Sequence, residues 1–342
     1  MLKTLLATAL LAWGCAASAA DKVYIANEDA DTVSVLDATS LKVLASVRVG
    51  KMPHNVQLSP DGKVVWVTNN GEPDADAAPS QAHPGMDKAD HAAMAKPGAV
   101  WLIDTGTDAV TARIPVGPHP AHVVLTPDGR FAYVTNGGDN SVTVIDTRTR
   151  SAVASIPVGR FPHGVRFAPG GRQAYVANLR GGTVSVIDVA SHKEVAQIPV
   201  GKGPAQVGFT PDGRLAFVSL SQEEAVAVID PATQKVMRKV KVGSVPIQLS
   251  ATPDSRMLLV ANQGSRSKPG DTVSMIDLPG FQVARTLKTG AGAHGVAVDR
   301  AGRFAYITNT YAGTVSVIDL QLRAVVSTVP VGKGPNGVSV SP

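Results

Sequence analysis

The sequence predicts an all-β protein: a seven-bladed β-propeller with four-stranded antiparallel blades. Short runs rich in β-branched residues alternate with turns of Gly, Pro, Asn and Asp. Two landmarks, a glycine that ends each unit and an aspartate that ends its third run, recur with the spacings 67, 42, 42, 42, 47 and 42, by subtraction of the positions that follow. The glycines are Gly50, Gly117, Gly159, Gly201, Gly243, Gly290 and Gly332, and the aspartates are Asp37, Asp104, Asp146, Asp188, Asp230, Asp277 and Asp319.

Residues 117–159 show one complete unit. Its four runs end near Thr126, at Asn136, at Asp146 and at Val158. Pro127-Asp128-Gly129 supplies a tight turn between the first two runs, and Asp146 can close the second hairpin through an Asx turn. Each unit therefore reads as one antiparallel blade.

Ring closure is predicted from the two ends of the repeat region. Residues 21–49 contain only three runs, and the missing first run appears at residues 337–341. The C-terminal strand is therefore expected to pair with the N-terminal strands, which leaves no open sheet edge. We expect one propeller domain over residues 21–342.

Several repeated motifs carry a family resemblance. Tyr133-Val134-Thr135-Asn136 and Ile307-Thr308-Asn309, with the Val-Ile-Asp and Pro-Asp-Gly elements, resemble the YVTN-repeat propellers, including the YncE-like exported bacterial proteins. The resemblance covers nearly the whole chain after residue 20 and implies the propeller fold. It leaves function open, because similar propellers are surface proteins, lactonases and subunits of redox enzymes.

Residues 1–20 are expected to be a secretory signal peptide, which implies a periplasmic or extracellular protein. Lys3 precedes an apolar run over residues 5–13, and Ala17-Ser18-Ala19 provides a cleavage site with small residues. The run is too short to span a membrane. Cys15 raises the alternative of a lipoprotein, which Trp13 disfavours because small residues are expected before a lipidated cysteine.

Composition excludes several classes of protein. Cys15 is the only cysteine, so the mature chain has neither a disulfide nor a haem c attachment site. Nucleotide-binding and hydrolase motifs are absent. The net charge of +5 and the aromatic content of 4% give no support to a nucleic-acid partner. We expect a monomer without a transmembrane segment.

An insertion at about residues 71–98 interrupts the first complete unit and adds 67 − 42 = 25 residues. Its His83, Met86, His91 and Met94 are ligand types for soft or borderline metals. A long loop in a compact repeat is usually functional or disordered, so two interpretations stand: a lid that carries ligands, and a solvated alanine-rich loop.

Four further histidines are expected at the mouth of the central channel. His54, His163 and His294 each follow a repeat glycine by four positions, and His122 lies one position further on. The topology places the insertion on the same face. The histidines either pack structurally between blades or form a ligand site, for which copper is the favoured ion because imidazole and thioether suit it.

Three classes of function follow. The first is an exported, non-catalytic protein that binds a metal ion, a small ligand or another exported protein at this face. The second is a propeller enzyme, lactonase-like or metal-dependent, although no acid/base pair is evident in the sequence. The third is a structural cell-surface scaffold. Catalytic residues are not assigned.

Processing of the N-terminus is the first testable expectation. Export should leave a mature chain that begins at Ala20 or Asp21, which intact-mass measurement of the secreted protein would reveal. A species that begins at Cys15 and carries the mass of a lipid would contradict this expectation and support the anchored form.

Overall fold

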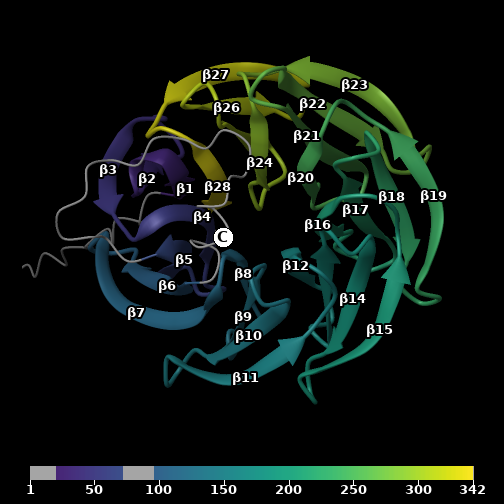
Figure 1. Ribbon diagram of the computed structural model, residues 1–342. Coiled ribbons are helices and arrows are strands. Elements are labelled where there is room, and N and C mark those ends of the chain that lie inside the picture. The colour runs from purple at the N-terminus through teal and green to yellow at the C-terminus, as the bar shows by residue number, and fades with distance from the viewer. Residues whose placement is uncertain (1–20, 72–95, 342) are drawn as a thin grey trace, which may run out of the picture.

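Each β-branched run expected from the sequence forms a strand in the computed structural model, which describes residues 21–71 and 96–341. The strands form seven antiparallel sheets of four, arranged as blades around a central axis, and we call the region along this axis the channel (Figure 1). The fold class is therefore confirmed. Beside the strands there is one described turn of 3-10 helix, η1 (Glu28–Ala30).

The first strand of each blade lies at the channel, and we call it the inner strand. From blade 1 to blade 7 the inner strands are β4 (Lys51–Leu58), β8 (Pro120–Leu125), β12 (Pro162–Phe167), β16 (Pro204–Phe209), β20 (Pro246–Ala251), β24 (Ala293–Val298) and β28 (Pro335–Val340). The second strands are β5 (Val64–Gly71), β9 (Phe131–Asn136), β13 (Gln173–Asn178), β17 (Ala216–Leu220), β21 (Met257–Gly264), β25 (Phe304–Asn309) and β1 (Lys22–Asn27).

The remaining strands complete the blades outwards, and the outermost ones form the rim of the ring. The third strands are β6 (Pro97–Asp104), β10 (Ser141–Asp146), β14 (Thr183–Asp188), β18 (Ala225–Asp230), β22 (Pro269–Asp277), β26 (Thr314–Asp319) and β2 (Thr32–Asp37). The outer strands are β7 (Ala109–Pro118), β11 (Ser151–Pro157), β15 (Lys193–Pro199), β19 (Lys235–Lys241), β23 (Gln282–Lys288), β27 (Ala324–Pro330) and β3 (Val43–Arg48).

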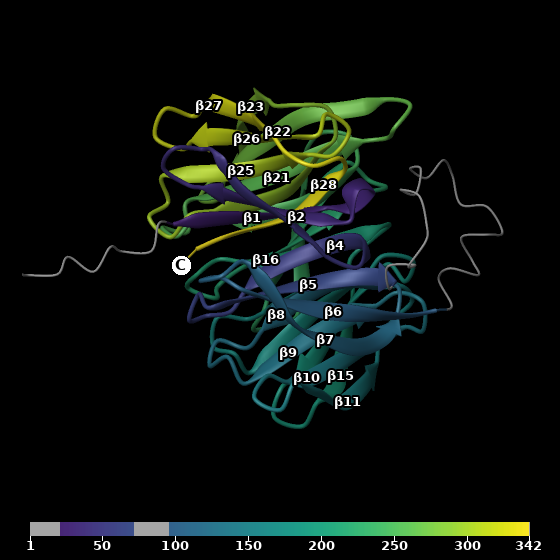
Figure 2. The ribbon, with the colours of Figure 1, turned by 90° about the vertical axis from the view of Figure 1, so that its left-hand side faces the viewer.

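The last strand closes the ring as the sequence predicts. In blade 7, β28 pairs with β1 in an antiparallel register that sets Val338 opposite Ile25 and Val340 opposite Val23 (Figure 2). The backbone N–H of Ser341 donates to the carbonyl of Lys22 at 2.9 Å. The N-terminal and C-terminal parts of the chain therefore share one sheet.

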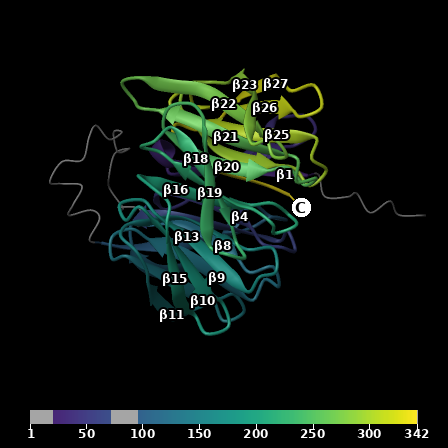
Figure 3. The ribbon, with the colours of Figure 1, turned by 90° about the vertical axis from the view of Figure 1, so that its right-hand side faces the viewer.

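The core lies between the blades, whose sheets stand side by side around the ring (Figure 3). In β9 and β13 every residue after the first is buried, because neighbouring blades cover both faces of a second strand. The outer strand β15 instead alternates exposed and half-buried residues along most of its length. Tyr133 is fully buried and belongs to a cluster that joins blade 2 to blade 3.

A glycine and an asparagine meet at almost every joint between blades. A Cβ on Gly117 would lie 2.6 Å from Cγ of Asn136, so only glycine fits there. Asn136 in turn donates from Nδ2 to the hydroxyls of Ser141 and Thr143, at 3.0 and 2.8 Å. The same contact joins Gly50 to Asn69, Gly159 to Asn178, Gly243 to Asn262, Gly290 to Asn309 and Gly332 to Asn27. In blade 4 the asparagine is replaced by Leu220.

A threonine hydroxyl bridges neighbouring blades next to the channel. Oγ1 of Thr135 accepts the backbone N–H of His122 in its own blade at 3.0 Å and donates to the carbonyl of His163 in blade 3 at 2.6 Å. Thr68, Ser219 and Thr308 make the same bridge from blades 1, 4 and 6. The threonine of the repeated motif therefore fixes how far one blade's inner strand is shifted along the central axis relative to the inner strand of the next blade.

The strands beside the insertion are longer than the sequence suggested. β5 runs on to Gly71 and β6 begins at Pro97, so both ends of the segment expected as a loop over about 71–98 are strand. The extra length continues a hairpin that pairs Asn69 with Ala99. Residues 72–95 lie outside the described part of the chain.

Replacement of Thr135 by valine should test the bridge. The change keeps the shape of the side chain and leaves the buried N–H of His122 and carbonyl of His163 without their hydroxyl partner, so the free energy of unfolding should fall by about 2–4 kcal/mol. Thr286→Val, on the exposed side of β23, is the control and should change it by less than about 0.5 kcal/mol. Equal effects of the two substitutions in urea unfolding would contradict the bridge.

Candidate functional site

The channel mouth is the end of the channel where the inner strands begin, and a β-bulge shapes it in every blade. In blade 3, Pro162 pairs with Asn178 and Val165 with Val176, so His163 and Gly164 oppose a single residue. We call these two places the first and second bulge positions. A bulge re-aims side chains, which explains why ligand types gather there.

The two bulge positions share the space at the mouth. The first positions of blades 1 to 7 are His54, Ala121, His163, Ala205, Ile247, His294 and Asn336. The second positions are Asn55, His122, Gly164, Gln206, Gln248, Gly295 and Gly337. A large polar residue at one position is accompanied by Gly, Ala or Ile at the other in every blade except the first. His122 therefore lies at a different bulge position from the other three histidines.

Three of the predicted histidines form a compact group. The candidate ligand nitrogens of His54, His122 and His163, from blades 1, 2 and 3, all lie within 4.8 Å of one another. Nε2 of His54 and Nε2 of His163 are 3.2 Å apart. The ring centroids of His122 and His163 are separated by 5.0 Å. The arrangement could hold one metal ion between imidazoles from three blades.

His163 is oriented by a backbone carbonyl. Its Nδ1 lies 2.9 Å from the carbonyl oxygen of Ala205 in blade 4, and this contact requires a proton on Nδ1. In the neutral ring, Nε2 then carries a lone pair, and this atom lies 3.2 Å from Nε2 of His54. A carbonyl that fixes the tautomer of an imidazole in this way is a common support for a metal ligand.

His54 is oriented by an amide and a carboxylate. Nδ2 of Asn336 lies 3.1 Å from Nδ1 of His54 and also donates to Oε2 of Glu28. Oε2 of Glu28 is 3.6 Å from Nδ1 of His54. When Nδ1 accepts from Asn336, the ring proton lies on Nε2 and is donated to His163. When the proton moves to Nδ1, Glu28 is the nearby acceptor and Nε2 becomes a lone pair.

His122 is fully buried and loosely held. Its Nδ1 lies 3.5 Å from Nε2 of Gln206, whose Oε1 accepts the backbone N–H of Val207 at 2.9 Å. Gln206 reaches it over Gly164, where a Cβ would collide with Oε1 of Gln206. Nε2 of His122 has no hydrogen-bond partner among the described residues. This atom is a buried polar group that a ligand would satisfy.

His294, the fourth predicted histidine, lies beside the group rather than in it. Its ring centroid is 6.2 Å from that of His54. The ring is 4% exposed, and Nδ1 has no hydrogen-bond partner in the described part of the protein. His294 therefore lines the mouth but stands further from a shared ion than the other three.

The loop residues His83, Met86, His91 and Met94 fall in the segment 72–95, outside the described residues, so their part in the site stays a prediction. His119, next to the mouth in sequence, has a ring centroid 5.2 Å from that of Phe161. The remaining histidine, His192, makes a hydrogen bond of 2.7 Å with the hydroxyl of Tyr133 and lies away from the other histidines.

Burial keeps three imidazoles of the mouth neutral, those of His122, His163 and His294. It lowers the pKa of His163 and of His294 to about 3, with the neighbouring His54 ring as the second cause. Burial also lowers the pKa of His122 well below its ordinary value. For Glu28, burial opposes ionisation, but the hydrogen bond and charge of His54 and the amide of Asn336 outweigh it and lower the pKa to about 2. The mouth therefore holds three neutral imidazoles and one carboxylate, which lies beside His54.

Sequence reasoning missed several polar groups of the mouth, among them Glu28, Gln206 and Gln248. Glu28 comes from η1 in the connection between β1 and β2, where no repeat landmark marks it. Gln206 and Gln248 occupy the second bulge position, as His122 does. An alignment of the seven units at that position, rather than at the repeat glycine, would have found the two glutamines.

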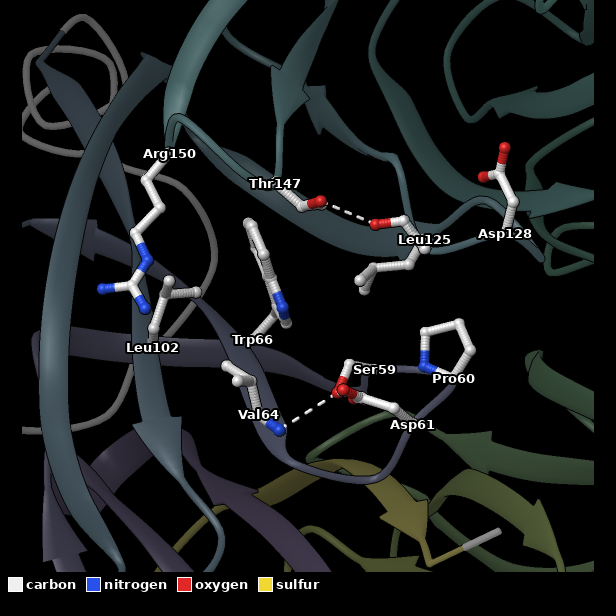
Figure 4. A pocket seen from close by; sticks show the side chains of 11 residues that line it. Ser59, Pro60, Asp61, Val64, Trp66, Leu102, Leu125, Asp128, Thr147 and Arg150 are labelled. Atoms are coloured by element: carbon white, nitrogen blue, oxygen red, sulfur yellow. Dashed lines mark hydrogen bonds between the residues drawn. The ribbon is translucent and has the colours of Figure 1, made fainter.

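The hollow drawn in Figure 4 is separate from the mouth and has a volume of about 300 Å³. It lies between blades 1 and 2 and is lined by turn residues such as Asp61 and Asp128 and by Trp66. Both aspartates are already bonded to hydroxyls of their own turns, Ser59 and Thr126. Neither aspartate is therefore unpaired, and the cluster of His54, His122, His163 and His294 lies at the opposite end of the blades.

The fold and the mouth together define a class: repeat propellers with a polar channel built from the starts of the inner strands. The chain belongs to the YNCE-like beta-propeller family, which it matches over residues 127–214 and 212–342. The resemblance of the repeated motifs to such propellers is thus confirmed.

Several known proteins are similar. The chain is 28% identical over 122 residues to Antigen Lp49 of Leptospira interrogans, a match that covers 36% of this chain and 24% of the antigen. Among solved structures, a functionally unknown protein from Desulfotomaculum acetoxidans has a TM-score of 0.74 and 17% identity, covering 94% of this chain and 98% of that one. Hydrazine synthase of Kuenenia stuttgartiensis has a TM-score of 0.70 and 24% identity, covering 83% and 88%.

A third structure, the dihydro-heme d1 dehydrogenase NirN in complex with DHE, has a TM-score of 0.66 and 17% identity and covers 93% of this chain and 74% of that one. At these identities the structural likeness shows the fold alone, and the chain spans about a quarter of the length of the antigen, as the 24% coverage states. Within the described residues, no helix is long and apolar enough to cross a membrane.

The neutral histidines should make stability depend on pH. Because the pKa of His294 is about 3 in the folded protein and about 6.5 when unfolded, the unfolded state binds more protons between these values. Stability is then fully present above about pH 6.5 and falls as the pH drops, by roughly 1.4 kcal/mol per pH unit for each such histidine.

Urea unfolding of metal-free protein at pH 7.5 and pH 5.0 would measure this dependence. His294→Asn introduces the residue that blade 7 has at the same place, Asn336, and should remove one histidine's share of the loss. Identical pH dependence of the parent and variant proteins would contradict a buried neutral His294.

Proposed function

We propose that this protein is an exported, non-catalytic binding protein that holds a copper ion at the channel mouth, with His54, His122 and His163 as ligands. One observation carries the proposal: imidazole nitrogens from three different blades lie within 4.8 Å of one another. Two imidazole nitrogens that each lie about 2.0 Å from one tetrahedral ion are about 3.3 Å apart. The separation of 3.2 Å between the Nε2 atoms of His54 and His163 is close to that value.

The surroundings of the three rings favour the same proposal. The carbonyl of Ala205 leaves Nε2 of His163 free to bind, and Glu28 can accept a proton from Nδ1 of His54 when Nε2 becomes a ligand. The rings of His122 and His163 are neutral at pH 7, and only neutral imidazole binds a metal. In this proposal copper takes part in no reaction, and the three histidines would only hold it.

The preference for copper over zinc rests on the residues of the insertion rather than on the three histidines. Three imidazoles suit both ions, whereas thioethers suit copper(I). Met86 and Met94, with His83 and His91, belong to the connection between β5 and β6, which starts and ends on the face of the mouth. We propose that this segment covers the bound ion. Export, which the N-terminal sequence predicts, would expose the site to copper outside the cytosol.

Two other functions compete. A lactonase-like or metal-dependent enzyme would need a group free to exchange protons with a substrate, whereas Glu28 is engaged by Asn336 and His54. A scaffold at the cell surface would need no ligand site. The enzymes among the structural relatives share only the fold with this chain, at 24% and 17% identity.

Titration of metal-free protein with Cu(I), Cu(II) and Zn(II) tests the proposal. We expect one copper ion per chain, with affinity at least about 100-fold lower in His163→Ala because a ligand is lost, and about 10-fold lower in Glu28→Gln because the orientation of His54 is lost. Because burial holds the pKa of His163 at about 3, protons should compete with copper for this ligand only well below pH 6.5. His192→Ala, away from the mouth, is the matched control and should bind as the parent does.

The outcomes separate the competing functions. Equal copper affinity in His163→Ala and His192→Ala would contradict the three-histidine site. A chain in which residues 72–95 are replaced by a short linker should bind Cu(I) more weakly while its Zn(II) affinity stays the same, if the loop supplies thioethers. If the parent protein binds no copper, the proposed site is wrong and the structural scaffold is the remaining function.

A further inference from the structure

The inner strands, all of whose residues are described, carry two lysine or arginine side chains and no carboxylate. Of their two ordinary cations, Lys51 stands at the start of β4 and pairs with Asp31 at 2.9 Å. The other is Arg166 on β12, three residues beyond His163 and near the opposite end of the strand.

Arg166 is a charge without a carboxylate partner among the described residues. Its Nη1 donates to the carbonyl of the adjacent Val165 at 3.0 Å, which uses one of its five N–H groups. Burial lowers the pKa of Arg166 to about 10, so the guanidinium stays protonated at neutral pH. Arg166 is half-buried, and a charge that is partly removed from water is normally paired, because its desolvation costs free energy.

The turn next to Arg166 lacks the acid that other blades have there. In blades 1, 2, 4 and 5 the turn after the inner strand contains an aspartate that bonds a Ser or Thr hydroxyl, namely Asp61, Asp128, Asp212 and Asp254. In blade 3 the corresponding residue is Gly170, and Ala168 replaces the hydroxyl residue. The blade that carries the channel cation is thus the one in which a glycine has taken the place of this acid.

A hollow of about 240 Å³ opens beside Arg166, at the end of the channel opposite the histidines. Inner strands of blades 3 to 6 line it, with Ser250 as a polar neighbour and with Leu249, Phe209 and Val296 as apolar ones. Gly208 contributes no side chain, since a Cβ there would meet Cδ1 of Leu249 at 2.5 Å. The lining therefore combines one cation with an apolar floor.

We propose that this hollow binds the carboxylate of a small organic acid with a short apolar tail. The guanidinium of Arg166 donates two parallel N–H groups to the carboxylate, the geometry that arginine prefers. The tail lies against Leu249 and Phe209. An inorganic oxyanion would satisfy the charge but leave the apolar floor unused. This site is independent of the copper site.

Binding of butyrate to chelator-treated protein tests the proposal, measured by NMR titration at constant ionic strength and pH 7.5. Sulfate tests a purely inorganic anion, and n-butanol tests the tail without the charge. We expect butyrate to bind at least about 10-fold more tightly than either. Arg166→Gln should weaken butyrate binding at least about 10-fold. Arg214→Gln, whose side chain is 86% exposed, is the matched arginine control and should leave it unchanged.

Gly170→Asp provides a second variant that does not depend on removal of Arg166. A Cβ on Gly170 meets no atom within 4 Å, and the change recreates the Pro-Asp-Gly turn of blades 1, 2 and 4. The new carboxylate should accept the backbone N–H of Arg172, as Asp128 accepts that of Arg130, so this surface variant should leave butyrate affinity within about twofold of the parent. Unchanged butyrate affinity in Arg166→Gln, no butyrate binding by the parent, or sulfate binding as tight as butyrate binding would each overturn the proposal.

Discussion

The joint between successive blades is the constraint on which the rest of the structure depends. At six of the seven joints a glycine lies so close to an asparagine side chain that a Cβ would collide with it. In five blades that asparagine also bonds hydroxyls of the third strand. Each joint fixes where the next inner strand begins, and therefore which residues fall in its bulge. The position of His163 opposite His54 follows from the joints, because neither ring could reach the other from a shifted strand.

Much of this arrangement could be predicted because repetition converts one local pattern into a global one. The repeat period predicted the seven blades, and the strand at the C-terminal end predicted how the ring closes. Topology alone brought His54, His122, His163 and His294 to one face, but it could not say which rings meet. That depends on the bulge, which separates His122 from the others by one position, and on side-chain packing across the channel. Glu28 escaped prediction because it lies on η1, outside the repeat.

The two ends of the channel differ in the ions that they suit. At the mouth, burial removes the charge from imidazoles, so lone pairs rather than cations face the interior. Near the other end Arg166 keeps its charge, because even burial leaves its pKa at about 10. The same physical cause, exclusion of water, thus has opposite results for bases of different strength. A neutral donor set suits a cation and a retained guanidinium suits an anion.

The number of blades has a consequence for symmetry. Blades 2 to 4 alternate between the second and the first bulge position for their large polar residue, but a strict two-fold alternation cannot close on a ring with an odd number of members. The mismatch falls in the last blades, where Gln206 and Gln248 repeat one choice and His294 and Asn336 repeat the other. There polar atoms of Gln248, His294 and Asn336 have no partner in the described chain. An odd number of blades thus forces at least one break in the alternation, and among blades 2 to 7 the breaks lie between blades 4 and 5 and between blades 6 and 7.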